Sequence, residues 1–266
     1  MAIISRHLIS LVVLMGLGVS VLRAETKSSI PVPAQVELKF TVFGTRTFKG
    51  LAYRVGNSSK VTPLKFYSVT LSDVNAYKGD QQIKFYDEVQ LTKELELIAA
   101  AKRLNPSAPE PQLGIKPVAI CSIPNGMKNA VLLFFPRSAP AADGIQCEVF
   151  PMDMSVTKVP AGSMVIVNAS GREFVGQVNS ATVKITRGVS EPYKAENGRI
   201  AVKIARVEPE FQNVVSGDRW VLGETQRRIW VLFPYSNTSD ALPDARCLVD
   251  RLPVEEKGLR TALLSP

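Results

Sequence analysis

The sequence predicts an all-β protein made of two tandem antiparallel β-sandwich domains, the first with a short helical insertion. Three observations predict this fold: alternating polar and apolar residues, short apolar runs between turn residues, and an internal repeat. The alternation is unbroken over 35–42 and nearly so over 182–185 and 199–204. Such alternation is typical of strands with one face in a core and the other in water.

Other runs are apolar on both faces, which favours inner strands of a sandwich. These runs lie at 130–135, 163–168 and 228–233. Glycine, proline, asparagine and serine separate the runs at short intervals, as at 56–58, 124–126 and 216–218. This spacing is typical of sandwiches or barrels and not of alternating strands and helices.

One segment has helical periodicity instead. Leu91, Leu95, Ile98 and Leu104 recur near helical spacing around three consecutive alanines, and Asn105 with the proline after it would end a helix. We therefore expect a helix over 92–104, followed by an extended proline-rich loop at 106–111.

An internal repeat gives the strongest evidence on domain organisation. The matched landmarks are Tyr77 with Tyr193, 132–136 with 230–234, Cys147 with Cys247, and Gly50 with Gly162. The first copy contains extra sequence between its landmarks, where the expected helix lies. We predict a linker at 25–34, a first domain at 35–153 with an insertion at about 89–112, a second domain at 154–253, and a tail at 254–266.

The amino terminus has the pattern of a secretory signal peptide. Arg6 and His7 precede an apolar run over 8–22, and Ala24 is a small residue at a plausible cleavage point. The alternative is an uncleaved anchor, which needs about 20 apolar residues, and this run is shorter and interrupted by glycines and serines. We expect cleavage after Ala24, a periplasmic or secreted location, and no integral membrane span in the remaining chain.

Removal of this segment restricts the available chemistry. His7 is the only histidine, so residues 25–266 contain none. Histidine-based catalysis and histidine metal sites are therefore excluded. Cleavage also removes Arg6 and Arg23 but no acidic residue, which lowers the formal charge of +8 by two. This modest charge is spread along the chain, so it suits loose attraction to anionic envelope polymers more than a concentrated patch.

Two catalytic patterns occur, each with a simpler structural interpretation. Ser155 and Lys158 match the Ser-x-x-Lys spacing of penicillin-recognising enzymes, but no helix is expected there and the partner motifs are missing. Paired carboxylates, as glycosidases require, occur at 87–88, at 94 with 96, and at 208 with 210. Sequence neighbours seldom flank a glycosidic bond, so we interpret these pairs as surface residues.

Aromatic side chains could stack on sugar rings. The candidates are Tyr53, Tyr77, Tyr193, Trp220, Trp230 and Tyr235. Tyr77 and Tyr193 recur before a strand, which suits tyrosines that hold a loop through the hydroxyl, and Trp230 lies in an apolar run. Trp220 and Tyr235 therefore remain the candidate ligand-binding residues.

The three cysteines permit one disulfide, and Cys121 with Cys147 in the first domain is feasible. Cys147 and Cys247 occupy equivalent repeat positions, which favours small buried residues over a bridge between domains. Without histidine or Cys-x-x-Cys we expect no zinc, and without a glycine-rich phosphate loop no nucleotide cofactor. Glycosylation sequons occur at Asn57, Asn168 and Asn237, although asparagine beside serine is also common in turns.

Several of these segments resemble a known class of protein. The segments at 77–86, 132–136 and 160–170 and the late strand at 230–234 resemble uncharacterised secreted bacterial proteins with tandem small Ig-like β-sandwich domains. The segment from Pro160 is also similar to Ig-like domains of unknown function in envelope proteins. The resemblance implies this fold and an extracytoplasmic location, and it implies no activity, substrate or catalytic residue.

We therefore expect a non-enzymatic, envelope-associated binding or structural protein without cofactors. Its expected partner is an envelope polymer or another protein, and not a nucleic acid. One alternative is a carbohydrate-binding module that uses loop aromatics. A second alternative is a histidine-free hydrolase that uses carboxylates or Ser155 with Lys158.

Overall fold

Four β-sheets and one helix form the part of the chain that the structure describes. The computed structural model describes residues 35–44, 48, 50–107, 109, 112–137, 139, 141–206, 214–233 and 244–253. The predicted signal peptide, the linker at 25–34 and the tail at 254–266 lie outside the described residues, as do His7 and Tyr235. The described chain clusters as one compact unit.

The strands are short and follow one another closely along the chain. In the first half they are β1 (Gln35–Gly44), β2 (Leu51–Tyr53), β3 (Thr62–Pro63), β4 (Asn75–Asp80), β5 (Gln82–Asp87), β6 (Ala119–Ser122), β7 (Asn129–Pro136) and β8 (Cys147–Asp153). In the second half they are β9 (Ser163–Asn168), β10 (Phe174–Val178), β11 (Ala181–Ile185), β12 (Gly188–Val189), β13 (Tyr193–Lys194), β14 (Arg199–Arg206), β15 (Val214–Val221), β16 (Gln226–Leu232) and β17 (Ala245–Arg251). The helix α1 spans Glu88–Leu104, between β5 and β6.

Both halves arrange their strands in the same order. The first half forms an outer sheet, β3-β2-β5-β6, and an inner sheet, β4-β1-β7-β8. The second half forms an outer sheet, β11-β10-β14-β15, and an inner sheet, β12-β9-β16-β17, with β13 also paired to β9. Each strand of the first half therefore has a counterpart in the second, and α1 is an addition to the first.

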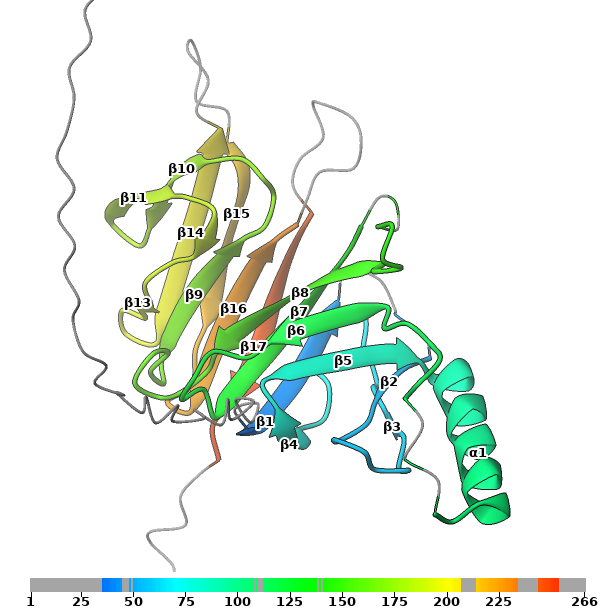
Figure 1. Cartoon of the computed structure of the whole chain (residues 1–266). Coiled ribbons are helices and arrows are strands. Elements are labelled where there is room, and N and C mark those ends of the chain that lie inside the picture. The colour runs from blue at the N-terminus through cyan, green and yellow to red at the C-terminus, as the bar shows by residue number, and fades with distance from the viewer. Residues whose placement is uncertain are drawn as a thin grey trace, which may run out of the picture. The chain divides into compact units, whose positions relative to one another are not determined.

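The sheets stack in successive layers with a hydrophobic core between each pair. One core lies between the two sheets of the first half and includes Phe40, Phe85 and Phe134. Another lies between the two sheets of the second half and includes Phe174 and Trp230. Figure 1 shows the resulting sequence of layers, from the second outer sheet through both inner sheets to α1.

A third core joins the two halves. Phe43, Val131 and Leu133 from the first inner sheet pack with Val165, Val231 and other residues of the second inner sheet. The rings of Phe43 and Phe233 lie 6.1 Å apart across this contact. Each inner sheet thus contacts a core on both faces, which explains why all residues of β9 are buried and why β7 and β16 contain the apolar runs 130–135 and 229–232.

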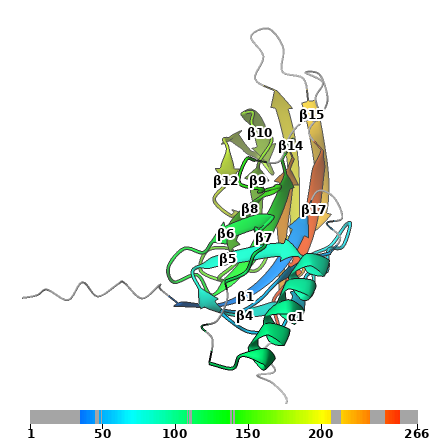
Figure 2. The same cartoon turned by 45° about the vertical axis from the view of Figure 1, so that its right-hand side comes forward.

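The helical insertion is confirmed, and α1 begins four residues earlier than the periodicity predicts. Asp87 caps the helix, since its carboxylate oxygen Oδ1 accepts a hydrogen bond from the backbone N–H of Gln90 at 2.9 Å. Leu91 and Leu95 pack against the first outer sheet beside Ala52 and Tyr86. Leu104 is 89% exposed, so the last turns of the helix extend beyond the core, as Figure 2 shows.

The predicted all-β fold is confirmed, with two differences in detail. Each inner sheet contains one parallel pair, β1 with β7 and β9 with β16. Alternation cannot reveal strand direction, because parallel and antiparallel strands share the same two-residue period. The match of Gly50 with Gly162 is wrong, since Gly50 precedes β2 whereas Gly162 precedes β9, the counterpart of β1.

A buried arginine holds the segment that connects the halves. Arg227 is 4% exposed and lies directly opposite Asp250 in the antiparallel pair of β16 and β17. Its Nε and Nη2 atoms donate to Asp250, and its Nη1 atom donates to the carbonyl oxygens of Met154 at 2.5 Å and Val159 at 3.0 Å. One side chain therefore connects β16, β17 and the junction between the halves.

No helix among the described residues combines the length and the apolar character needed to cross a bilayer.

Candidate functional site

Basic side chains gather on the solvent-facing side of the second outer sheet. Partners in an antiparallel pair project from the same face, and neighbours along a strand project from opposite faces. The register of β14 and β15 therefore places Arg199, Lys203 and Arg219 together, opposite the face on which Val202 and Ile204 are buried. All three cations are exposed, and none has an ion pair among the described residues.

Small residues between these cations leave two shallow grooves. Ala201 and Gly217 line the space between the long side chains, and the neighbouring strand β10 adds the amide of Gln177. The stem of Lys203 lies across Gly217, where an added Cβ atom would be 3.2 Å from Lys203 Cγ. The grooves have volumes of about 610 and 710 Å³, and both are lined by Gln177, Asn179, Ala201 and Arg219.

A tight hairpin positions the amide residues of this face. Asn179 has a φ of 52°, the left-handed conformation that asparagine tolerates in turns. Its Oδ1 atom accepts from the N–H of Ala201 at 2.9 Å, and its N–H donates to the Ala201 carbonyl at 2.7 Å. The β10–β11 turn is thus fixed to β14 beside the grooves.

The acidic residue next to Arg219 in β15 points away from the cations. Asp218 is opposite Val202 in the register, so it projects toward the inner side of the sheet. Consistent with this, its charge acts on Cys247 of the second inner sheet. Burial raises the pKa of the Cys247 thiol, Arg228 opposes the increase and Asp218 adds to it. Asp218 still borders the smaller groove and Glu196 the larger one, but two of the three cations line each groove, so the grooves carry more positive than negative charge.

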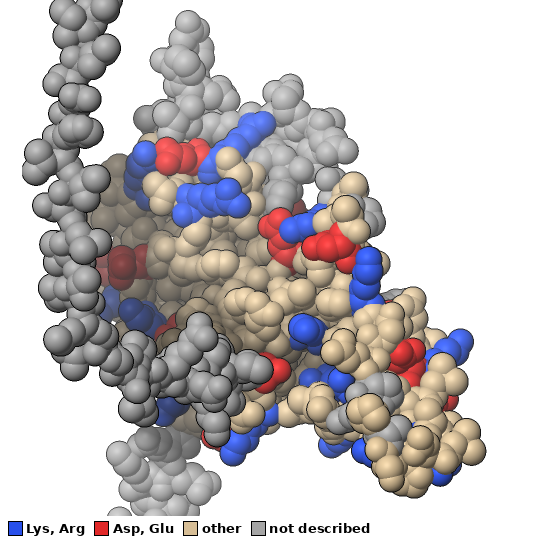
Figure 3. All heavy atoms as spheres, viewed as in Figure 1, with Lys and Arg blue, Asp and Glu red and all other residues tan. Residues whose placement is uncertain are grey.

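Elsewhere the surface charge is mixed. On the face seen in Figure 3, basic and acidic side chains are interspersed around a broad uncharged area. At the other edge of the second outer sheet, Lys184 is paired with Glu173 at 2.8 Å. The three cations of the second outer sheet differ from this arrangement because the strand register places them together on one sheet face.

The predicted ligand-binding aromatics fall in different places. Trp220 borders the larger groove, but the register directs it inward beside Ile200, and its ring packs against Trp230 with a centroid distance of 5.6 Å. The indole therefore has only part of its surface available for stacking. Tyr235 lies outside the described residues.

The other tyrosines serve the fold. Tyr53 is 1% exposed and its hydroxyl donates to the carbonyl of Ala76 at 3.2 Å. The Tyr77 hydroxyl donates to the carbonyl of Asp80 at 3.0 Å. Burial, with a smaller contribution from the charge of Asp80, raises the pKa of Tyr77 to about 12. Both hydroxyls thus anchor backbone within the first half.

Ser155 and Lys158 do not form a nucleophile and base pair. They lie in a turn in which the N–H of Lys158 donates to the Ser155 carbonyl at 3.0 Å. The Ser155 hydroxyl is 3.1 Å from the Thr157 hydroxyl, and no hydrogen bond joins it to the amine of Lys158. This turn lies in the connection between β8 and β9.

One member of each described carboxylate pair has a structural contact. Asp87 caps α1, and Glu94 accepts a hydrogen bond at its Oε1 atom from the N–H of Gly114 at 2.6 Å. The pair at 208 and 210 lies outside the described residues. Across the part of the chain that the structure describes, no group of three or more acidic, cysteine or histidine side chains is placed to hold a metal ion.

The cysteines are free thiols in the structure, with Cys121 and Cys147 buried in the same core. Burial raises the pKa of Cys121 to about 12 and that of Cys147 to about 11. Thiols with such pKa values carry little thiolate near neutral pH, which makes them poor nucleophiles. A disulfide between Cys121 and Cys147 stays a prediction.

No protein-family model matches this chain, and no curated protein matches it. The resemblance to secreted Ig-like proteins accordingly stays a prediction.

Sequence reasoning missed the three cations as a group. Each looks like an ordinary exposed residue of an alternating strand, and they come together only once the register between β14 and β15 is known. The small residues at Ala201 and Gly217 are the one local signal, because small side chains on the solvent face of paired strands leave room for a ligand.

Proposed function

We propose that this protein is a non-catalytic binding module of the cell envelope that holds an anionic polymer on its second outer sheet. The observation that carries the proposal is the set of exposed, unpaired cations Arg199, Lys203 and Arg219 around a floor of small residues. Cations in fixed positions beside side-chain amides suit carboxylate or phosphate groups repeated along a chain.

The shape of the site also favours a polymer. Two adjoining open grooves on a sheet face bury little of a small molecule, since small-molecule sites are mostly concave and enclosed. An extended polymer can instead contact several strands in turn. A location outside the cytoplasm, as the apolar amino-terminal segment indicates, would bring the module to anionic envelope polymers.

A non-catalytic role is supported by the chemistry of the described residues. The thiols have raised pKa values, the Ser155 hydroxyl contacts Thr157, and the carboxylates of Asp87 and Glu94 have structural contacts. These groups therefore favour binding over a hydrolytic reaction.

The test is retention of the protein on beads that carry polygalacturonate, compared with neutral agarose beads. The site variant is Arg199→Gln/Lys203→Gln/Arg219→Gln. The matched control replaces three exposed lysines of the first half, Lys78, Lys84 and Lys93, by Gln. Both triple variants lose the same net charge, so only a local site distinguishes them. Assays at about 50 and about 500 mM salt add a measure of screening.

We expect the site variant to bind polygalacturonate at least about tenfold more weakly, because each charge-assisted contact contributes on the order of 1 kcal/mol at an exposed site. The control variant should retain most of the binding. Equal losses in both variants would mean diffuse attraction by net charge and would reject the site. A different outcome is binding of the protein to the neutral beads. If only Trp220→Phe, and neither triple variant, abolishes that binding, the result would support the carbohydrate-stacking alternative.

A further inference from the structure

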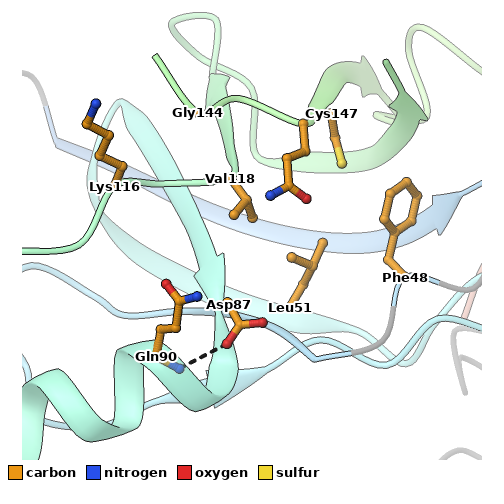
Figure 4. Close-up of a pocket in the computed structure, with 9 residues that line it drawn as sticks. Phe48, Leu51, Asp87, Gln90, Lys116, Val118, Gly144 and Cys147 are labelled. Atoms are coloured by element: carbon orange, nitrogen blue, oxygen red, sulfur yellow. Dashed lines mark hydrogen bonds between the residues drawn. The ribbon is translucent and has the colours of Figure 1, made fainter. Parts of the chain in front are cut away.

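A second, more enclosed pocket lies in the first half, beside the start of α1. It has a volume of about 450 Å³ and is lined by segments that are far apart in the sequence. Figure 4 shows Asp87 and Gln90 on one side and Lys116, Val118 and Cys147 on the other. The volume falls within the range of about 300–1,000 Å³ that is typical of small-molecule sites.

The insertion of α1 creates one wall of this pocket. Asp87 ends β5 and Gln90 lies in the first turn of α1, whereas the equivalent connection in the second half, 207–213, is too short for a helix of this length. The pocket therefore depends on the feature that distinguishes the first half from the second. This dependence links the insertion to binding, beyond its contacts with the first outer sheet.

The polar groups of the pocket carry opposite charges. Asp87 uses Oδ1 for the helix cap, and its Oδ2 atom has no hydrogen-bond partner among the described residues. Lys116 is exposed at the rim, with its stem against the turn at Gly144, and it has no ion pair among those residues. In Figure 4 the amine extends away from Asp87, and its flexible stem allows it to turn over the opening.

The remaining lining is apolar or neutral. Leu51 and Cys147 are buried, and Val118 and Phe48 are partly buried. Because the Cys147 thiol stays protonated near neutral pH, it contributes an uncharged surface and no nucleophile. A ligand in this pocket would therefore bind reversibly. It would carry a donor for the Asp87 carboxylate, an acceptor for the Lys116 amine, and an apolar part between the two.

We propose that this pocket binds a zwitterionic ligand of the amino-acid or short-peptide class. Its ammonium group binds the free oxygen of Asp87, its carboxylate binds Lys116, and its apolar side chain lies over Leu51 and Val118. This site is separate from the polymer-binding face, so each can fail without the other.

The test is an NMR titration of the ¹⁵N-labelled protein with the dipeptide Ala-Leu, and with N-acetyl-Ala-Leu and Ala-Leu amide as blocked controls. We expect the free dipeptide to shift the amide signals of Gln90, Lys116 and Gln146. Each blocked peptide should bind about tenfold more weakly, since each loses one charge-assisted contact. Absence of shifts at these three residues, or equal binding of the blocked peptides, would overturn the proposal.

Two variants test the roles of the charged residues. Asp87→Asn removes the charge but keeps a side chain that caps helices equally well, so α1 should remain folded by circular dichroism. Lys116→Gln removes the amine at an exposed position. We expect each to weaken Ala-Leu binding about tenfold, while Lys93→Gln on the exposed side of α1 leaves it unchanged. Unchanged binding in Asp87→Asn and Lys116→Gln would overturn the assignment.

Discussion

Replacement of Arg227 by Met should destabilise the protein more than any other single change at its charged residues. The guanidinium of Arg227 is buried and donates to Asp250 and to two carbonyl oxygens of the junction. Methionine fills a similar volume without these donors. The substitution therefore leaves Asp250, whose side chain is 20% exposed, and both carbonyls without their partner.

The size of the effect follows from these losses. Removal of one partner from a buried ion pair costs about 3–5 kcal/mol, and each unpaired buried carbonyl adds to that. Because Asp250 keeps some contact with water, the pair belongs at the lower end, and we expect a total of about 4 kcal/mol. With a urea dependence of about 3 kcal/mol per molar, the midpoint should fall by about 1.3 M.

Urea unfolding followed by tryptophan fluorescence measures this shift, since Trp230 is buried in the second half. Arg246→Met is the matched control, because Arg246 pairs with Asp244 but both side chains are about half exposed. Exposed pairs contribute only about 0–1 kcal/mol. Addition of Asp250→Asn to Arg227→Met should restore part of the loss by removing the stranded charge. A midpoint for Arg227→Met equal to that of Arg246→Met would refute this reasoning.

Three further changes should have measurable effects. Gly176→Ala should lower the thermal midpoint, because the added Cβ atom would lie 2.7 Å from a backbone carbonyl oxygen of β14. Gly223→Ala should leave the midpoint unchanged, because its Cβ atom would meet only a side chain, at 3.4 Å. Asn168→Ala should cost about 2–4 kcal/mol in urea unfolding, because the 1%-exposed amide donates to two carbonyls and accepts from two donors; an unchanged midpoint would contradict this. In the reduced protein, folding raises the pKa values of Cys121 and Cys147, so ionisation of these thiols favours the unfolded chain. The urea midpoint should therefore be constant below about pH 9 and fall as the pH rises toward 11. A double Cys121→Ala/Cys147→Ala variant should show a smaller fall, and an identical fall would exclude the thiols as its cause.

Much of the fold could be predicted because it depends on local patterns. The alternation at 35–42 and 199–204 became β1 and β14, and the runs with two apolar faces became β7, β9 and β16. The sequence could not show why those runs need two apolar faces. Contact between the two inner sheets supplies the reason, and it depends on packing between distant segments.

Helix boundaries illustrate a second limit. The first turn of α1 contains Glu88 and Val89, of which Val89 is 59% exposed, so it adds little to the apolar periodicity. The capping carboxylate of Asp87 fixes where the helix begins, and a capping residue has no periodic signature. Leu104 fits the periodicity but is exposed, because the core under α1 ends before it.

The candidate sites were harder to foresee than the fold. The pocket beside α1 combines residues near 48, 87, 116 and 146, which no short motif connects. Likewise, Arg227 stands between Gln226 and Arg228, a polar context typical of exposed residues, and only the structure shows that it is buried opposite Asp250. The partial exposure of Trp220 could be predicted from the sequence, but the packing of its ring against Trp230 could not.

The core shared by the two inner sheets has a consequence for assembly. It brings together equivalent faces, β1-β7-β8 and β9-β16-β17, as an isologous interface does between two subunits of a homodimer. Here both partners belong to one polypeptide, and a connection of this length gives an effective concentration in the millimolar range. Association of the halves is therefore independent of how dilute the protein becomes.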